Sequence, residues 1–169
     1  DLDLNFDDLA QKINSDLVGK FSNIFSRSAS FIAKNNNKLA PVLDESYLEE
    51  SRAREQKIYD LFESKNYSKA VKLIMEIADN TNKYINGKEP WKLPQDKAIV
   101  VATTAINIFK NLCILLHPVI PKITVRMLAM LKISEITNSE LSTKLLDIEI
   151  LEFKAVLSRI EPLDAKYFH

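Results

Sequence analysis

Apolar residues recur at three- and four-residue steps along most of the chain, which is the period of an α-helix. The first such stripe is interrupted by a single serine and consists of Leu9, Ile13, Leu17, Phe21, Ile24, Ser28 and Phe31. It predicts a long helix that is capped by Asn5 and ends near Lys34, because a turn-prone run of three asparagines (35–37) follows. This helix has one face that can join a core.

Two further amphipathic segments follow. The first is expected to be one helix that begins at residue 44 or 46 and ends near residue 64, with a mixed-charge outer face. The second begins after Asn66, and Gly87 is expected to stop it because glycine is preferred at a left-handed C-terminal cap. Pro90 and Pro94 are expected to keep the connector that follows extended and stiff.

The segment from residue 94 or 95 to residue 116 is apolar over much of its circumference, which is typical of the central helix of a bundle. His117 is expected to cap this helix, and Pro121 opens a fifth helix that ends near residue 132. The rest is expected to contain a polar loop (134–143), a short extended segment (145–151) and a short helix (152–160). With two glycines and six prolines, the chain is predicted to be an all-α bundle of about five main helices with a short irregular C-terminal segment.

Composition narrows the functional classes. A chain of 169 residues suits one domain, here residues 1–169. Its 23 basic and 23 acidic residues cancel, so any contact with nucleic acid must be local and specific. The single cysteine, Cys113, excludes an internal disulfide framework and suits a reducing compartment, so we expect a cytoplasmic protein.

No membrane association is expected, because Asn107, Lys110 and Asn111 interrupt the longest apolar run, residues 99–116. The chain begins with DLDLNFDDL and has no initiating methionine, so we expect it to have been cut from a longer chain.

Catalytic chemistry is not visible in the sequence. His117 and His169 have no cysteine or histidine partner at metal-ligand spacing, so no metal site is expected. Two glycines are too few for a phosphate-binding loop, and no serine or cysteine lies in a nucleophile motif. We therefore expect no catalytic residue in this chain.

Binding chemistry is more visible. Trp91, the only tryptophan, lies in the proline-bracketed connector next to Lys88 and Lys92. Aromatic side chains on rigid supports beside cations are what unpaired RNA bases stack on. Asn23 and Arg27 are four residues apart on one polar flank of the first helix. The alternative interpretation is that the two polar residues are simply solvated and that Trp91 packs into the core.

Four segments carry a family resemblance: NSDLVGKFSNIFSRSASFI, NKYINGKEPWKL, INIFKNLCILLHPVIPKI and FKAVLSRIE. In this order and spacing they resemble the anticodon-binding domain of methionyl-tRNA synthetase, a class I aminoacyl-tRNA synthetase, over essentially the whole chain. The third segment resembles class I anticodon domains in general, and LSRIE departs from the FPRIE-like ending of many relatives. The resemblance implies a helical bundle that is appended to a Rossmann-fold catalytic domain, whose HIGH and KMSKS signatures this chain lacks.

The resemblance also implies a binding site. The family's anticodon-contacting residues fall on Asn23 and Arg27 of the first helix and on Pro90 and Trp91 of the connector. Trp91 would stack on the cytosine that begins the CAU anticodon of methionine tRNA. The parent enzyme would join methionine to this tRNA with ATP and Mg²⁺, whereas the fragment itself would hold no cofactor and would contribute recognition only.

Four lysines, Lys20, Lys34, Lys88 and Lys92, are candidate contacts to the tRNA backbone. Two alternatives remain open: a helical bundle that binds another protein, and the anticodon domain of a different class I synthetase. Trp91 separates RNA binding from the first alternative, because RNA binding requires an indole that is partly exposed and close to Asn23 and Arg27.

Overall fold

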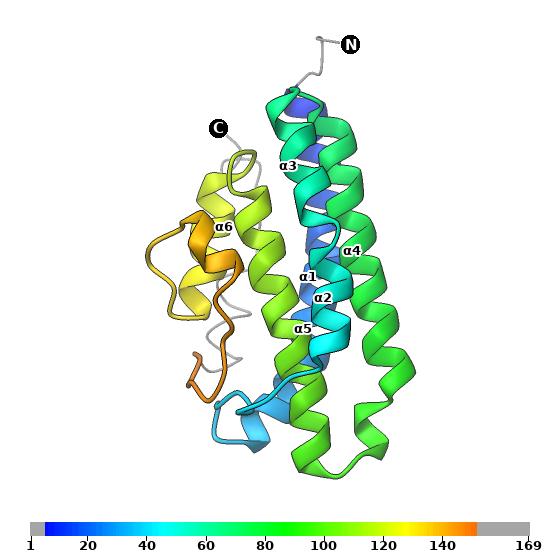
Figure 1. Cartoon of the computed structure of the whole chain (residues 1–169), viewed down its shortest axis with the longest axis vertical. Coiled ribbons are helices and arrows are strands. Elements are labelled where there is room, and N and C mark those ends of the chain that lie inside the picture. Colours follow the sequence, from blue (N-terminus) through cyan, green and yellow to red (C-terminus); the bar gives the residue numbers. More distant parts are fainter. Residues whose placement is uncertain (1–5, 152–169) are drawn as a thin grey trace.

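The structure is a computed structural model that describes residues 6–151, and it shows a bundle of helices (Figure 1). Its helices are α1 (Phe6–Lys34), α2 (Glu45–Arg52), α3 (Glu55–Glu63), α4 (Tyr67–Lys88), α5 (Gln95–Leu116) and α6 (Pro121–Met130), with two 3₁₀ helices, η1 (Pro90–Lys92) and η2 (Asn138–Leu141). Within the described residues there is no β-strand, so the predicted all-α class is confirmed.

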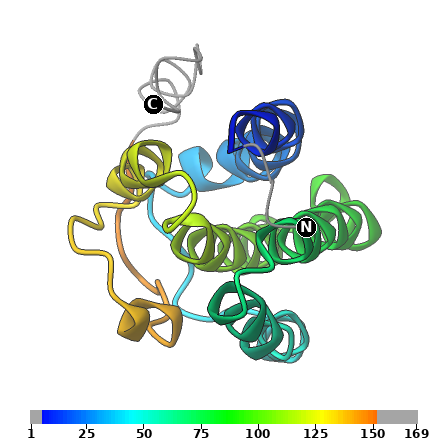
Figure 2. The ribbon, with the colours of Figure 1, turned by 90° about the horizontal axis from the view of Figure 1, so that it is seen from above.

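Helix α5 is the centre of the bundle, with the other helices arranged around it (Figure 2). Almost every side chain from Ala98 to Leu116 is buried. The ring of Phe109 lies edge-on to two rings of α1, at centroid distances of 5.6 Å from Phe21 and 4.9 Å from Phe25. The core therefore joins the first helix to one from the second half of the chain, as the apolar patterns predict.

Length and composition alone would allow α5 to cross a membrane, contrary to the expectation drawn from its polar interruptions. However, 94% of its most apolar stretch is buried inside the bundle. The core helix of a folded domain meets the same criteria. Helix α5 is therefore a core helix of the bundle.

The polar residues of α5 bind the irregular segments that cross it. The hydroxyl of Thr103 accepts a hydrogen bond from the Ala40 N–H at 2.8 Å. The amide of Asn107 pairs with both backbone groups of Leu145, donating to its carbonyl at 3.0 Å and accepting from its N–H at 2.7 Å. These bonds satisfy polar groups that would otherwise be costly to bury.

Two more polar residues of α5, Lys110 and Asn111, form hydrogen bonds that involve a buried ionisable group. Lys110 donates to the backbone carbonyls of Glu140 and Thr143, and burial lowers the pKa of Lys110 to about 8. Asn111 donates to Glu55 of α3 at 2.8 Å, while burial raises the pKa of the Glu55 carboxyl. The polar side of α5 thus fixes both the η2 segment and α3 to the core.

The single helix expected between residues 44 and 64 is two helices, α2 and α3. The Arg54 N–H bonds the Ser51 carbonyl, three residues back, so the turn tightens between them. On a straight helix at about 100° per residue, the buried residues Leu48 and Ile58 would face directions about 80° apart. The break allows both side chains to reach the core.

Helix α4 ends two residues later than expected. Gly87 lies inside the helix, and the left-handed cap is Glu89, with a φ of 45°. Because Glu89 precedes Pro90, a right-handed helical conformation is disfavoured there, and the helix stops at that point. The connector is not fully extended either, since Pro90–Lys92 forms the 3₁₀ helix η1.

Other boundaries agree with the sequence. Helix α1 ends at Lys34, and α5 begins at Gln95, as predicted. The segment 145–151 is extended only in part, since it bends at Asp147, where φ is 55°. It pairs with the residues after α1, for example through the Leu39 N–H and the Ile148 carbonyl at 2.8 Å. The predicted Asn5 cap and the predicted helix 152–160 lie outside the described residues.

Candidate nucleic-acid interface

The connector between α4 and α5 presents Trp91 to solvent. Its side chain is 56% exposed, whereas Pro90 beside it is buried. Within the connector, the Lys92 N–H bonds the Glu89 carbonyl at 2.8 Å, and the Leu93 N–H bonds the Pro90 carbonyl at 3.2 Å. A buried proline and a closed turn therefore hold up an exposed indole, which contradicts the alternative in which Trp91 packs into the core.

Both flanks of this connector are fastened to α1. On the α4 side, Arg27 Nη1 donates to Asn86 Oδ1 at 2.6 Å. On the α5 side, Gln95 Nε2 donates to the backbone carbonyl of Phe31 at 2.9 Å. Figure 1 shows the connector at the same end of the bundle as the C-terminal end of α1. The turn that carries Trp91 thus begins and ends beside one stretch of α1, at Arg27 and Phe31.

Asn23 lies one helical turn before Arg27, about 6 Å along the axis of α1. Its side chain is exposed, and its backbone carbonyl accepts a hydrogen bond from Ser26 Oγ at 3.2 Å. Just before it, Asn82 Nδ2 of α4 donates to the Lys20 carbonyl at 3.1 Å and holds α1 against α4. Asn23 therefore extends the polar surface at Arg27 away from the connector.

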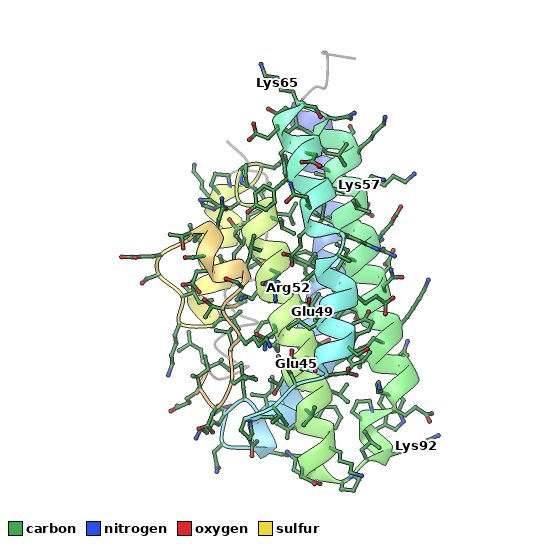
Figure 3. All side chains as sticks on the ribbon, in the orientation of Figure 1. Glu45, Glu49, Arg52, Lys57, Lys65 and Lys92 are labelled. Carbon is green, nitrogen blue, oxygen red and sulfur yellow. The ribbon has the colours of Figure 1, made fainter. Side chains whose placement is uncertain are left out.

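The lysines proposed as backbone contacts lie in different surroundings. Lys92 projects outward from the connector (Figure 3) and pairs with Glu89 at 2.7 Å. Lys20 pairs with Asp79 at 2.7 Å, and Lys34 is exposed in the last turn of α1. Exposed pairs such as Lys92–Glu89 contribute little stability, so the lysine can exchange its partner for a phosphate.

Lys88 points to the other side of α4 from Asn86, since two helical positions differ by about 200°. Its Nζ lies 3.3 Å from Asp44 Oδ2 and 5.5 Å from the centroid of the Tyr84 ring. Partial burial raises the pKa of Asp44, but hydrogen bonds from the Tyr47 N–H, Lys88 and Tyr84 together lower it below its ordinary value. Lys88 thus ties α4 to the start of α2 and does not lie on the face of α4 that carries Asn86.

His117 and Cys113, the described residues that were examined for metal binding or nucleophilic chemistry, both have a structural role. The backbone of His117 caps α5, and its Nδ1 lies 2.8 Å from Thr124 Oγ1. Cys113 is fully buried, and burial raises the pKa of its thiol. Among the described residues, no group of three or more His, Cys, Asp or Glu side chains is placed to hold a metal ion.

Sequence reasoning missed Asn86 and Gln95, which connect the Trp91 turn to α1. In the sequence, Asn86 directly precedes Gly87, the residue that is expected to stop the helix. The available signal was its spacing from Asn82, since asparagines four residues apart line one side of α4. Only the packed structure shows that this side faces α1.

Comparison with known proteins identifies the family of this chain. Residues 44–160, more than half of the chain, match the family described as the anticodon-binding domain of tRNA ligase. The match begins at α2, so α1, with Asn23 and Arg27, lies outside it.

Solved structures show the same fold. The methionyl-adenylate-bound crystal structure of Mycobacterium tuberculosis methionyl-tRNA synthetase matches 84% of this chain with a TM-score of 0.72 and 19% identity. Its free state matches 83% of this chain with a TM-score of 0.70 and 20% identity. In both cases the chain spans only 31% of that protein. On the match over residues 44–160 and the shared helical fold, the chain belongs to the family of anticodon-binding domains of tRNA ligases.

Proposed function

We propose that the chain is the anticodon-binding part of a methionyl-tRNA synthetase and that it reads the CAU anticodon of methionine tRNA. The family match and the fold shared with the mycobacterial enzyme support this proposal, as do the sequence segments that resemble methionyl enzymes. Because the chain spans 31% of that enzyme, ligation of methionine with ATP and Mg²⁺ is assigned to a catalytic domain elsewhere in the parent protein.

The observation that carries the proposal is an exposed Trp91 on a turn that is tied to α1 at Arg27 and Phe31. A flat aromatic ring that is held in place before binding loses little conformational entropy when a base stacks on it. An anticodon loop offers unpaired bases, and such bases are the usual targets of sequence-specific RNA recognition. We therefore assign the first anticodon base to the face of Trp91.

Arg27 and Asn23 would then read the edge of that base. Cytosine presents an amino donor, a ring-nitrogen acceptor and a carbonyl acceptor, whereas the ring nitrogen of uracil is a donor. A guanidinium only donates, so Arg27 suits the two acceptors of cytosine and opposes the ring N–H of uracil. The Asn23 carboxamide oxygen can accept from the amino group of cytosine.

Phosphate contacts would come from local lysines, because the chain has no net charge. Lys92, Lys34 and Lys20 lie on the elements that carry the proposed pocket, and we retain them as backbone contacts. Lys88 is also retained, on condition that RNA can draw it away from Asp44. Contacts of this kind weaken as salt is added.

The experiment uses Trp91 as its own reporter, since it is the only tryptophan in the chain. A CAU anticodon stem-loop is titrated into the protein, and we expect the indole fluorescence to be quenched as the base stacks. In a parallel anisotropy assay with labelled RNA, Trp91→Ala should weaken binding by about 1–3 kcal/mol. Trp91→Phe should retain most of the affinity. Lys57→Ala, on exposed α3 (Figure 3), is the control.

Base specificity is tested with stem-loops that differ only at the first anticodon position. Arg27→Ala should remove about 1–3 kcal/mol of preference for cytosine over uracil. An equal loss for both RNAs would make Arg27 a phosphate contact instead. Unchanged affinity for Trp91→Ala would remove the indole from the mechanism. Preference for a different anticodon would assign the chain to another class I synthetase.

A further inference from the structure

The Arg27 side chain is held by α4 through one of its terminal nitrogens. Nη1 donates to Asn86 Oδ1 at 2.6 Å and lies 3.5 Å from the Asn82 carbonyl, which is the limit for a hydrogen bond. A guanidinium has five N–H donors in a fixed plane. Within the described part of the chain, no acceptor is bound to Nη2 or Nε of Arg27, so these donors are available to a ligand.

Asn86 is the group that fixes this geometry. Arginine has a long side chain with about 2 kcal/mol of rotamer entropy, and a single short bond to a fixed acceptor removes much of that freedom. Asn82 has a different role, because its amide nitrogen donates to the Lys20 and Ala78 carbonyls and holds α1 and α4 together.

The position of Asn86 couples Arg27 to the connector. Asn86 lies in the last turn of α4, and its backbone carbonyl accepts the N–H of Glu89, the residue that turns the chain into η1. Its side chain and its backbone therefore bind, respectively, the guanidinium and the start of the turn that carries Trp91. A movement of Asn86 would change the angle between the indole and the guanidinium.

We infer that Asn86 is a positioning residue that aims the Arg27 guanidinium at the edge of the base on Trp91 and thereby sets the discrimination between cytosine and uracil. The inference rests on the proposed function. It assigns Asn86 no contact with RNA. Its effect should appear in the ratio of affinities for the two bases, because that ratio depends on the direction of the Arg27 donors.

The test compares Asn86→Ala and Asn86→Asp with the unchanged chain, using the CAU and UAU stem-loops. Asn86→Ala should lower the cytosine-to-uracil affinity ratio by about tenfold, the effect of losing one charged hydrogen bond. Asn86→Asp keeps an acceptor oxygen in place, so it should keep the cytosine-to-uracil affinity ratio of the unchanged chain. Its negative charge should weaken the binding of both RNAs. Asn80→Ala, on the side of α4 that faces α2, is the matched control.

Arg27→Ala and the double variant Arg27→Ala/Asn86→Ala complete a cycle. We expect the single variant Arg27→Ala and the double variant to have the same cytosine-to-uracil affinity ratio, because Asn86 acts only through Arg27. Nitrogen-15 spectra of Arg27 give a readout without RNA: Asn86→Ala should speed exchange of its guanidinium protons. Thermal midpoints of all variants show whether each still folds.

The outcomes separate the two proposals. If Arg27→Ala abolishes the preference for cytosine but Asn86→Ala does not, the positioning role is overturned and the proposed function stands. A uniform loss of affinity for both RNAs in Asn86→Ala, or unchanged proton exchange at Arg27, also overturns the positioning role. If Arg27→Ala leaves the preference unchanged, the proposed reading by Arg27 fails, and the inference fails with it.

Discussion

Replacing Lys110 by methionine is expected to change how stability depends on pH. In the folded chain Lys110 is buried, and burial lowers its pKa to about 8. In the unfolded chain a hydrated lysine has a pKa near 10.5. Between these two values the unfolded chain binds more protons than the folded chain. The contribution of Lys110 to the free energy of unfolding should therefore rise with pH across this window.

The magnitude follows from the gap of about 2.5 pH units, at about 1.4 kcal/mol for each unit. The stability of the unchanged protein relative to Lys110→Met should grow by about 3 kcal/mol as the pH rises from 8 to 10.5. Methionine also leaves the Glu140 and Thr143 carbonyls without their buried donor. That cost does not depend on pH, so the change across the window is the decisive quantity.

The assay is denaturant unfolding, followed by far-UV circular dichroism at a series of pH values. Lys57→Met on the exposed face of α3 is the control for the loss of a surface lysine. A constant difference between the unchanged protein and Lys110→Met from pH 8 to 10.5 would refute the reasoning. It would mean that Lys110 keeps its proton in the folded chain as easily as in the unfolded one.

Three further predictions concern stability and accessibility. Gly87→Ala should raise the free energy of unfolding by about 0.5–1 kcal/mol, measured by denaturant titration, because Gly87 lies inside α4 and an added Cβ meets nothing within 4 Å. Phe109→Ala should cost about 3–5 kcal/mol in the same assay, since it removes the ring between Phe21 and Phe25. Cys113 should resist alkylation in the native protein and react once it unfolds, because its thiol is buried and its pKa is raised; rapid labelling of the native protein would contradict its burial.

The sequence predicts the helices that have a strong apolar pattern. The stripe through Phe21 and Ile24 places α1, and the asparagines at 35–37 place its end at Lys34. The apolar circumference between Gln95 and Leu116 identifies α5 as the central helix. In both cases a local pattern is sufficient, because a helix with a wide apolar surface has to bury it. The position of Trp91 between prolines and lysines favours exposure, but only the structure excludes its packing into the core.

Features that depend on tertiary packing could not be predicted in this way. The break between α2 and α3 arises because Leu48 and Ile58 must face the same core, and no glycine or proline marks it. Likewise, the bond from Arg27 to Asn86 joins two helices that are distant in sequence. Periodicity shows which face of a helix is polar. It does not show which other helix that polar face will contact in the folded chain.

The position of α5 has a consequence for synthesis on the ribosome. Phe21 and Phe25 are made before their partner Phe109, which lies in the second half of the chain. At about 5–20 residues per second, α1 waits for several seconds before that partner emerges. A chain that ends before Gln95 lacks α5, so the face of α1 that carries Phe21 and Phe25 would lack the Phe109 ring that packs against it. Nascent chains of intermediate length are therefore the ones that should engage chaperones.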